Sequence, residues 1–133
     1  MKESDWRYKL VTLYRKQHPD NFIWAMDAKF KAGFPDLYII EAGLGKHFEL
    51  KVFSSVSGIS IGTLKNFFKP IQISIMKSIN SGGGHAIGLA LNKSTSNVYL
   101  FHPVHDICHI MTPERFKRWW LETHHSWAEA EAI

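Results

Sequence analysis

Three charged residues, Asp36, Glu49 and Lys51, have the types and the spacing needed for hydrolysis of a phosphodiester. Glu49 and Lys51 belong to segment 47–53, where side chains alternate between polar and apolar, so we expect a β-strand with both on one face. Asp36 precedes an apolar run, residues 37–40, that predicts a second strand. Two glycines between the runs allow a return turn, and a hairpin about it would bring Asp36 close to Glu49 and Lys51.

The like charges of the two carboxylates indicate which chemistry to expect. At about 4 Å they repel each other by ~4 kcal/mol at an effective dielectric constant of about 20, so the pair favours a bound cation. Mg²⁺ suits such a pair, with Mn²⁺ as a substitute, because it binds through one or two carboxylates together with water and phosphate oxygens. Lys51 would orient an attacking water or hold a phosphate. These residues therefore predict metal-dependent hydrolysis of phosphodiesters.

The same residues resemble a known signature. Gly33-Phe34-Pro35-Asp36, then twelve residues, then Glu49-Leu50-Lys51 is similar to the motif of the PD-(D/E)xK nuclease superfamily, which includes type II restriction enzymes, archaeal Holliday-junction resolvases and phage VRR-type nucleases. The resemblance implies a restriction-endonuclease-like α/β fold, with a central mixed sheet of about five strands flanked by helices. It also implies a Mg²⁺-dependent DNA endonuclease in which the Leu50 carbonyl joins the two carboxylates as a metal ligand.

Two more site residues follow from this resemblance. Members of the superfamily often carry a metal-site glutamate on the first helix, which makes Glu3 the candidate here and Asp5 the fallback, although acids are favoured in a first helical turn in any case. Gln72 is similar to a glutamine that supports the site of VRR-type and RecB-type nucleases, and Met76 replaces the tyrosine of the RecB-type pattern. The alternative for Gln72 is a cap or a backbone hydrogen bond.

Residues that would contact DNA are expected around the motif. Two lysines come just before Gly33, and a serine-rich and glycine-rich segment, 54–62, leaves the catalytic strand as a flexible loop. Alternatively, the lysines could be ordinary solvated loop residues, and the segment could be a connection without a role in binding. The candidates for DNA contact are Lys29, Lys31, Ser55, Ser57, Lys65 and Lys69.

The remaining pattern gives the order of elements. Helical spacing of apolar residues predicts a helix over 3–17, and a Pro70 start with three glycines after residue 81 bounds another over about 70–80. A last helix begins at 112–114 and has Phe116, Trp119, Trp120 and Trp127 on its apolar side. The expected order is a helix, a three-stranded antiparallel meander (21–27, 37–40, 47–53), a helix, two strands (85–91, 97–101) and a helix.

Composition sets broad limits. The 133 residues, 45% of them hydrophobic, suffice for one compact domain, 1–133. A net charge of +4 favours an anionic partner. The single cysteine, Cys108, excludes an internal disulfide and fits a reducing compartment. No apolar run approaches the length of a membrane span and no signal-peptide pattern is present, so we expect a cytoplasmic protein.

One rival metal site is present in the sequence. His102, His105, Cys108 and His109 are all zinc-ligand types, but structural zinc sites usually join two separated pairs of ligands. A strand through 107–111 would also point Cys108 and His109 to opposite faces. We therefore prefer the carboxylate site.

The resemblance leaves several functions open. The first is a structure-selective nuclease like the small junction resolvases, acting on branched DNA as a homodimer with Trp119 and Trp120 as interface anchors. Gln72 supports an alternative, a VRR-type nicking or flap nuclease of phage or mobile-element origin. Two others are a non-catalytic DNA-binding module on the same fold and an enzyme acting on another phosphate ester. No DNA-reading motif such as a zinc finger is appended, which disfavours sequence-specific targeting.

Overall fold

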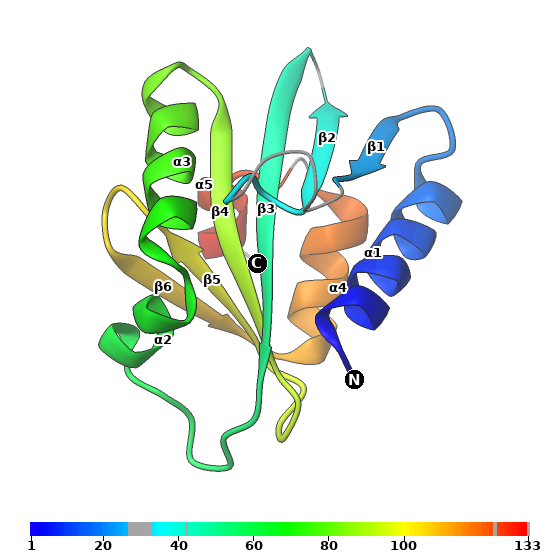
Figure 1. Ribbon diagram of the computed structural model, residues 1–133. Coiled ribbons are helices and arrows are strands. Elements are labelled where there is room, and N and C mark those ends of the chain that lie inside the picture. The colour runs from blue at the N-terminus through cyan, green and yellow to red at the C-terminus, as the bar shows by residue number, and fades with distance from the viewer. Residues whose placement is uncertain (27–32, 42, 124, 133) are drawn as a thin grey trace.

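The computed structural model describes residues 1–26, 33–41, 43–123 and 125–132. Figure 1 shows helices on both sides of one twisted sheet. In chain order the elements are α1 (Glu3–Gln17), β1 (Phe22–Ala25), β2 (Leu37–Glu41), β3 (Leu44–Phe53), α2 (Ile61–Phe67), α3 (Pro70–Ser81), β4 (His85–Asn92), β5 (Val98–His102), β6 (Ile107–Met111), α4 (Pro113–Glu122) and α5 (Trp127–Ala132).

The sheet of the described chain has six strands in the order β1-β2-β3-β4-β5-β6. Neighbours are antiparallel except β3 and β4, which are parallel and are joined through α2 and α3. The predicted α/β class with a mixed sheet flanked by helices is therefore correct. The expected number of about five strands is one too low, because β6 extends the sheet by pairing with β5.

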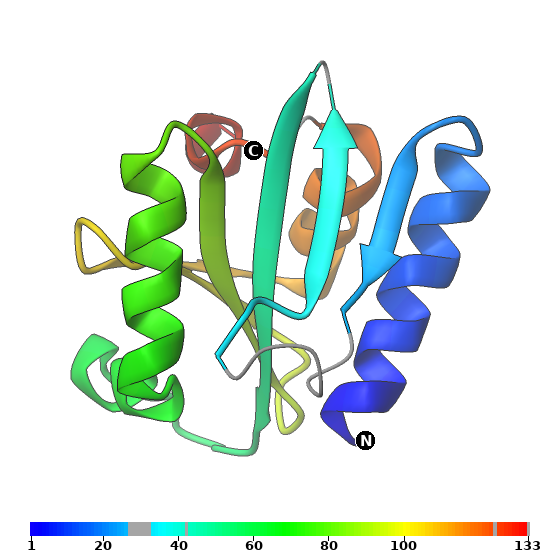
Figure 2. The same ribbon diagram turned by 45° about the horizontal axis from the view of Figure 1, so that its top comes forward.

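Strand alternation divides the side chains between two helical layers. Phe48 and Leu50 of β3 join the core that includes buried residues of α1, α4 and α5, whereas Ala86 and Ala90 of β4 join the core under α2 and α3. Glu49 lies between Phe48 and Leu50, so its side chain points to the α2/α3 face. As Figure 2 shows, α3 covers β4 on that face, and no helix of the described residues covers β1 and β2 there.

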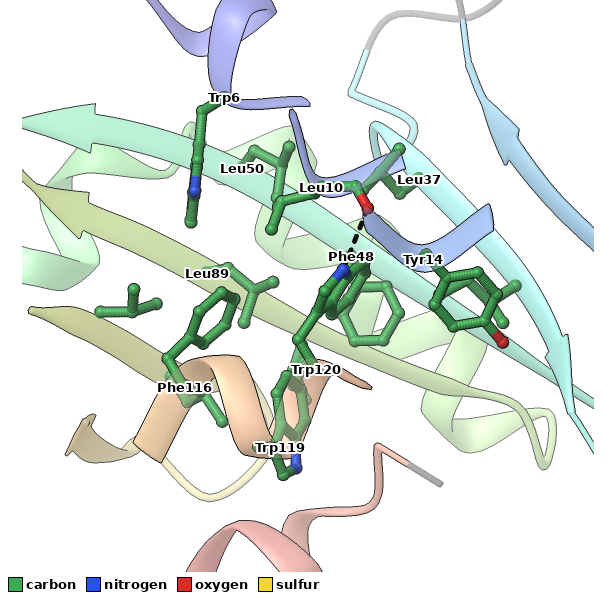
Figure 3. Packing of buried hydrophobic residues seen from close by; sticks show 14 of the residues in the cluster. Trp6, Leu10, Tyr14, Leu37, Phe48, Leu50, Leu89, Phe116, Trp119 and Trp120 are labelled. Atoms are coloured by element: carbon green, nitrogen blue, oxygen red, sulfur yellow. Dashed lines mark hydrogen bonds between the residues drawn. The ribbon is translucent and has the colours of Figure 1, made fainter. Parts of the chain in front are cut away.

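The larger core is built around aromatic side chains of α1 and α4. Trp119 and Trp120 are fully buried there, and the indole nitrogen of Trp120 donates a hydrogen bond of 3.0 Å to the Leu10 carbonyl (Figure 3). This bond and the burial of Trp6 hold α1 against α4. The expectation that Trp119 and Trp120 anchor a dimer interface is wrong, since neither is accessible to a partner.

The connection after β3 differs from the expected flexible loop 54–62. Ser60 caps α2 by accepting a hydrogen bond from the Thr63 N–H, so a helix already begins at Ile61. The preceding segment is also fastened, because the Asn92 side chain bonds both the N–H and the carbonyl of Ser55. The serines that suggested flexibility act instead as a helix cap and as hydrogen-bonding partners.

Two element boundaries also differ from the prediction. Strand β3 begins at Leu44 instead of residue 47, because the turn between β2 and β3 is tight and Glu41 pairs with Leu44. Trp127 lies in the separate helix α5 and not in α4, which ends at Glu122. The other predicted helices and strands lie within a few residues of the observed ones.

A buried polar cluster, which the sequence did not predict, joins the β2–β3 hairpin to the C-terminal segment. Glu41 accepts hydrogen bonds from Tyr14 Oη (2.8 Å) and Lys46 Nζ (3.2 Å), and its Oε1 lies 2.7 Å from His125 Nδ1. Burial raises the pKa of Glu41, but the hydrogen bonds and charges of its partners, His125 foremost, outweigh burial and lower it to about 2. The cluster is therefore a structural tie between β2, β3 and the chain after α4.

Candidate active site

The hairpin brings Asp36 to the middle of β3, as the sequence predicts. The last ladder pair joins Leu37 to Phe48, and beyond it the Asp36 carboxylate accepts a 2.8 Å hydrogen bond from the Leu50 N–H. Because the N–H and carbonyl of one strand residue point to the same edge, the Leu50 carbonyl is also directed toward the Asp36 end of β2. Asp36, Glu49 and Leu50 are thus assembled at one point.

Glu49 is the buried centre of the site, with only 3% of its surface exposed. Its Oε1 accepts a 2.9 Å hydrogen bond from Gln72 Nε2 and lies 3.8 Å from Lys51 Nζ. Its Oε2 is buried and has no hydrogen-bond partner among the described residues. A buried carboxylate oxygen without a partner is costly, so this atom is suited to bind a cation.

The electrostatics of Glu49 support the same conclusion. Burial is the largest cause that raises the pKa of Glu49, to about 9, and the negative charge of Asp36 raises it further, while Lys51 opposes the shift. Without a cation, the site therefore keeps a proton on Glu49 at neutral pH.

Gln72 is oriented by the start of α3. Its side-chain carbonyl accepts a 2.9 Å hydrogen bond from the Lys69 N–H, so the amide NH₂ is turned toward Glu49. One side chain therefore both caps α3 and donates a hydrogen bond to Glu49. Gly33, with φ +80°, lets the chain before Asp36 pass close to Ile71 of α3, where any Cβ would lie 2.9 Å from that side chain.

Arg7 is a site residue that the sequence analysis missed. It lies on α1, and its Nη1 is 3.7 Å from Asp36 Oδ1, with both side chains partly exposed. The available signal was its position four residues after Glu3, on the same helical stripe. Arg7 adds a positive charge beside the carboxylates, where a phosphate would approach.

The first-helix acids do not join the ligand set. Asp5 accepts a hydrogen bond from the Lys2 N–H and so caps α1. Glu3 is exposed, and its negative charge contributes a little to the raised pKa of Glu49. Among the described residues no three His, Cys, Asp or Glu side chains converge as a metal-binding group, so Glu3 is not gathered with Asp36 and Glu49.

The donor set that remains is small but fits Mg²⁺. It consists of the Asp36 and Glu49 carboxylates and the Leu50 carbonyl, all oxygen ligands, and Mg²⁺ characteristically keeps several waters beside one or two carboxylates. The orphaned Glu49 Oε2 and the like charges of the pair are the features that a cation would satisfy. Imidazole or thiolate ligands, which zinc prefers, are not part of this set.

The candidates for DNA contact have mixed outcomes. Lys29 and Lys31 lie outside the described residues. Lys69 is exposed at the start of α3, beside Gln72, whereas Lys65 pairs with Asp106 at 3.0 Å. Ser57 is exposed, but Ser55 is bonded to Asn92 and to the Gly58 carbonyl.

The rival histidine and cysteine residues lie on β5, β6 and the turn between them. Cys108 packs with the α2/α3 core, where burial raises the pKa of its thiol to about 11. His109 contacts Trp127 of α5 on the opposite face of the sheet. The predicted opposite orientation of Cys108 and His109 is confirmed.

Comparisons with known proteins add no family to this picture. The chain matches no model of a known protein family, and no curated protein matches it. Within the described ranges, every helix is too short or too polar to cross a lipid bilayer.

Proposed function

We propose that this protein is a Mg²⁺-dependent DNA endonuclease, with Mn²⁺ as a substitute ion, whose site is formed by Asp36, Glu49 and Lys51. The proposal is carried by the environment of Glu49. This carboxylate is buried beside that of Asp36, and one of its oxygens has no hydrogen-bond partner among the described residues. A purely structural glutamate at this position would be paired on both oxygens or replaced by an apolar residue.

The side chains have separable roles in this proposal. Asp36, Glu49 and the Leu50 carbonyl hold the ion, and Gln72 fixes the Glu49 carboxylate by its hydrogen bond. When bound, Mg²⁺ supplies Lewis-acid stabilisation of the charge that develops on the scissile phosphate. Lys51 donates a hydrogen bond to water or to a phosphate oxygen, and Arg7 neutralises charge beside Asp36.

The fold supports membership of the restriction-endonuclease-like group as part of the proposal. The resemblance implies a mixed sheet flanked by helices, and the expected order is a helix, an antiparallel meander that carries the motif, a helix and two further strands. Here α1 precedes the β2–β3 hairpin, and β4 runs parallel to β3 after α2 and α3. The glutamine on α3 agrees with the VRR-type resemblance.

We further propose that the substrate is branched DNA, recognised by shape. A domain of 133 residues has little surface for reading base sequence once one face carries the catalytic site. In the resolvase-like form a homodimer would cut a four-way junction, and in the VRR-type form the enzyme would nick DNA or cut a flap. With Trp119 and Trp120 buried, the homodimer must use another surface.

The test is a cleavage assay on a panel of linear, nicked, flapped and four-way DNAs, each with Mg²⁺, Mn²⁺, Ca²⁺ or excess chelator. We expect cleavage of branched DNA with Mg²⁺ or Mn²⁺ and none with chelator. Binding of the panel without cleavage under any condition would favour the non-catalytic DNA-binding module. Hydrolysis of a small phosphodiester or phosphomonoester, but not of DNA, would favour the third class of enzyme.

A further inference from the structure

An open groove of about 420 Å³ runs between α1 and the edge strand β1. Helix α1 and β1 lie side by side at the outer edge of the sheet in Figures 1 and 2. The lining includes Ser4, Arg7, Tyr8, Val11, Arg15 and Trp24. Apart from the adjacent pair Arg7 and Tyr8, the five α1 residues lie three or four positions apart, so they form one stripe along the helix.

The groove combines positive charge with exposed aromatic rings. Tyr8 is 75% exposed and Trp24 is 52% exposed, although large aromatic side chains are normally well buried. Arg7 and Arg15 lie on the same α1 stripe, and the described residues that line the groove include no acid. The surface is therefore complementary to a polyanion that also offers flat apolar faces.

The groove leads to the candidate active site. Arg7 lines the groove and also contacts Asp36 at 3.7 Å. On the sheet, Trp24 pairs with Tyr38, and Tyr38 pairs with His47, whose ring stacks on Tyr38 at 4.5 Å. Since paired residues share a face, this aromatic row lies on the face that carries Glu49, opposite the face on which α1 packs, and Trp24 joins the groove at the edge of the sheet.

We propose that this groove, called here the α1/β1 groove, binds an unpaired DNA strand next to the cleaved phosphodiester. Phosphates contact Arg7 and Arg15, and bases stack on Tyr8 and Trp24. Rings can stack on bases only where the duplex is open, so the preferred substrate joins a duplex to a single strand, as a flap does. The biological role of this groove rests on the proposed nuclease function, but binding of the DNA strand can be measured without cleavage.

The first measurement uses the Glu49→Gln protein in chelator, which prevents cleavage. Fluorescence anisotropy with labelled oligo(dT) gives affinity, and quenching of tryptophan fluorescence reports stacking. All five tryptophans lie in the described chain; Trp24 is the most exposed, Trp127 is partly exposed and the other three are buried, so Trp24→Phe also shows how much of the quenching comes from Trp24. We expect Tyr8→Ala and Trp24→Ala each to weaken binding roughly five-fold to one hundred-fold, with Trp24→Phe restoring most of it.

Charge is tested separately. Arg15→Gln should lower the slope of log affinity against log salt by roughly 0.7, the share of one phosphate contact on single-stranded DNA. Arg118→Gln, an exposed arginine on α4, is the matched control and should leave the single-strand affinity unchanged. Thermal melts should show that Tyr8→Ala and Arg15→Gln remain folded, because both side chains are exposed.

The outcomes separate the groove from the catalytic site. Binding that is unaffected by Tyr8→Ala, Trp24→Ala and Arg15→Gln overturns the groove proposal even if the protein cuts DNA. A dimer that these variants convert to monomer, with DNA binding unchanged, overturns it in favour of a second copy of the chain. Groove-dependent binding by a protein that cuts no DNA supports the groove and rejects the nuclease.

Discussion

At the residue scale, Glu49 is held in a state that is unfavourable for the folded protein without a metal. Its pKa is near 9 in the folded chain and 4.5 ordinarily, so above pH 4.5 the unfolded chain gains stability by ionising this group. The stability of the folded protein therefore falls between these two pH values. This is the pattern expected where function, and not stability, determines a side chain.

The first prediction follows from that cost. Glu49→Gln should raise the free energy of unfolding of the metal-free protein at neutral pH by roughly 1–3 kcal/mol, because a neutral amide replaces a buried acid. The same variant should lose DNA cleavage. Urea titrations and cleavage assays on one preparation provide both measurements. Gln72 Nε2 can still donate to the new carbonyl, so lost packing should not mask the gain. A destabilised variant would mean that the pair with Lys51 outweighs burial.

The second prediction concerns ion binding and pH. Glu49 must lose its proton to bind Mg²⁺, so affinity should rise with pH up to about 9. Calorimetry at neutral pH, in two buffers of different ionisation enthalpy, should detect release of close to one proton per Mg²⁺. Ca²⁺ should bind without supporting cleavage, since its larger and looser coordination sphere activates water poorly. Mg²⁺ binding without proton release would contradict the assigned state of Glu49.

The central residues could be predicted because strand alternation and a hairpin are local patterns. Glu49 and Lys51 are two residues apart, and the two glycines of the turn are visible in the sequence. Arg7 could not be placed, because its distance to Asp36 depends on how α1 docks on the sheet. The same holds for Glu41 and His125, which are 84 residues apart in the chain.

At the element scale, the hairpin that carries the site is tied to the C-terminal segment by Glu41. The pKa of Glu41 is lowered to about 2 from 4.5, so its contribution to stability is present above pH 4.5 and is lost as the pH falls toward 2. Because the site depends on this hairpin, acid should loosen both together.

The third prediction tests this tie. Wild-type stability should fall by up to about 3 kcal/mol between pH 4.5 and 2 through Glu41 alone, and Glu41→Gln should remove that part of the pH dependence. At neutral pH, Glu41→Gln should cost roughly 3–5 kcal/mol, because it leaves Lys46 buried without its counter-charge. The double variant Glu41→Gln/Lys46→Met is the control and should recover much of the loss. Parallel pH profiles of wild type and Glu41→Gln would contradict the assignment.

Elements with a local signal were predicted and those without one were missed. The period of α1 and the Pro70 start of α3 were sufficient to place both helices. Helix α2 was missed because the Ser60 cap lies in a serine-rich stretch that looks like a loop. A strand through 107–111 was predicted and is confirmed as β6, but it was not counted as part of the sheet, because its half-exposed residues give a weak alternation.

At the scale of the whole molecule, the two faces of the sheet differ in how completely helices cover them. One face is filled by α1, α4 and α5, and the other is covered by α3 over β4, while no helix of the described ranges covers β1 and β2 (Figure 2). The proposed catalytic residues Asp36 and Glu49 lie at the border between the covered and uncovered parts. This arrangement places the site next to open surface without exposing Glu49.

The fourth prediction is a preference for branched DNA. With Mg²⁺, flapped DNA should be cut at least about tenfold faster than linear duplex, since stacking of one unpaired base contributes roughly 1–3 kcal/mol to binding. Sedimentation at micromolar concentration, together with a four-way junction as substrate, tests the homodimer expected for a resolvase. Equal rates on linear, flapped and four-way DNA, from a monomer, would exclude both branched-DNA forms and leave only a general nuclease.

The central claim is that Asp36, Glu49 and Lys51 form a metal-dependent catalytic site. It is tested most directly by the single-turnover cleavage rate of Asp36→Asn with saturating Mg²⁺, beside the matched control Asp20→Asn, an exposed aspartate in the turn before β1. We predict a loss of roughly a hundredfold to a thousandfold for Asp36→Asn, the range typical of removing one group that stabilises transition-state charge, and none for Asp20→Asn. Cleavage by both variants at the wild-type rate would contradict the account.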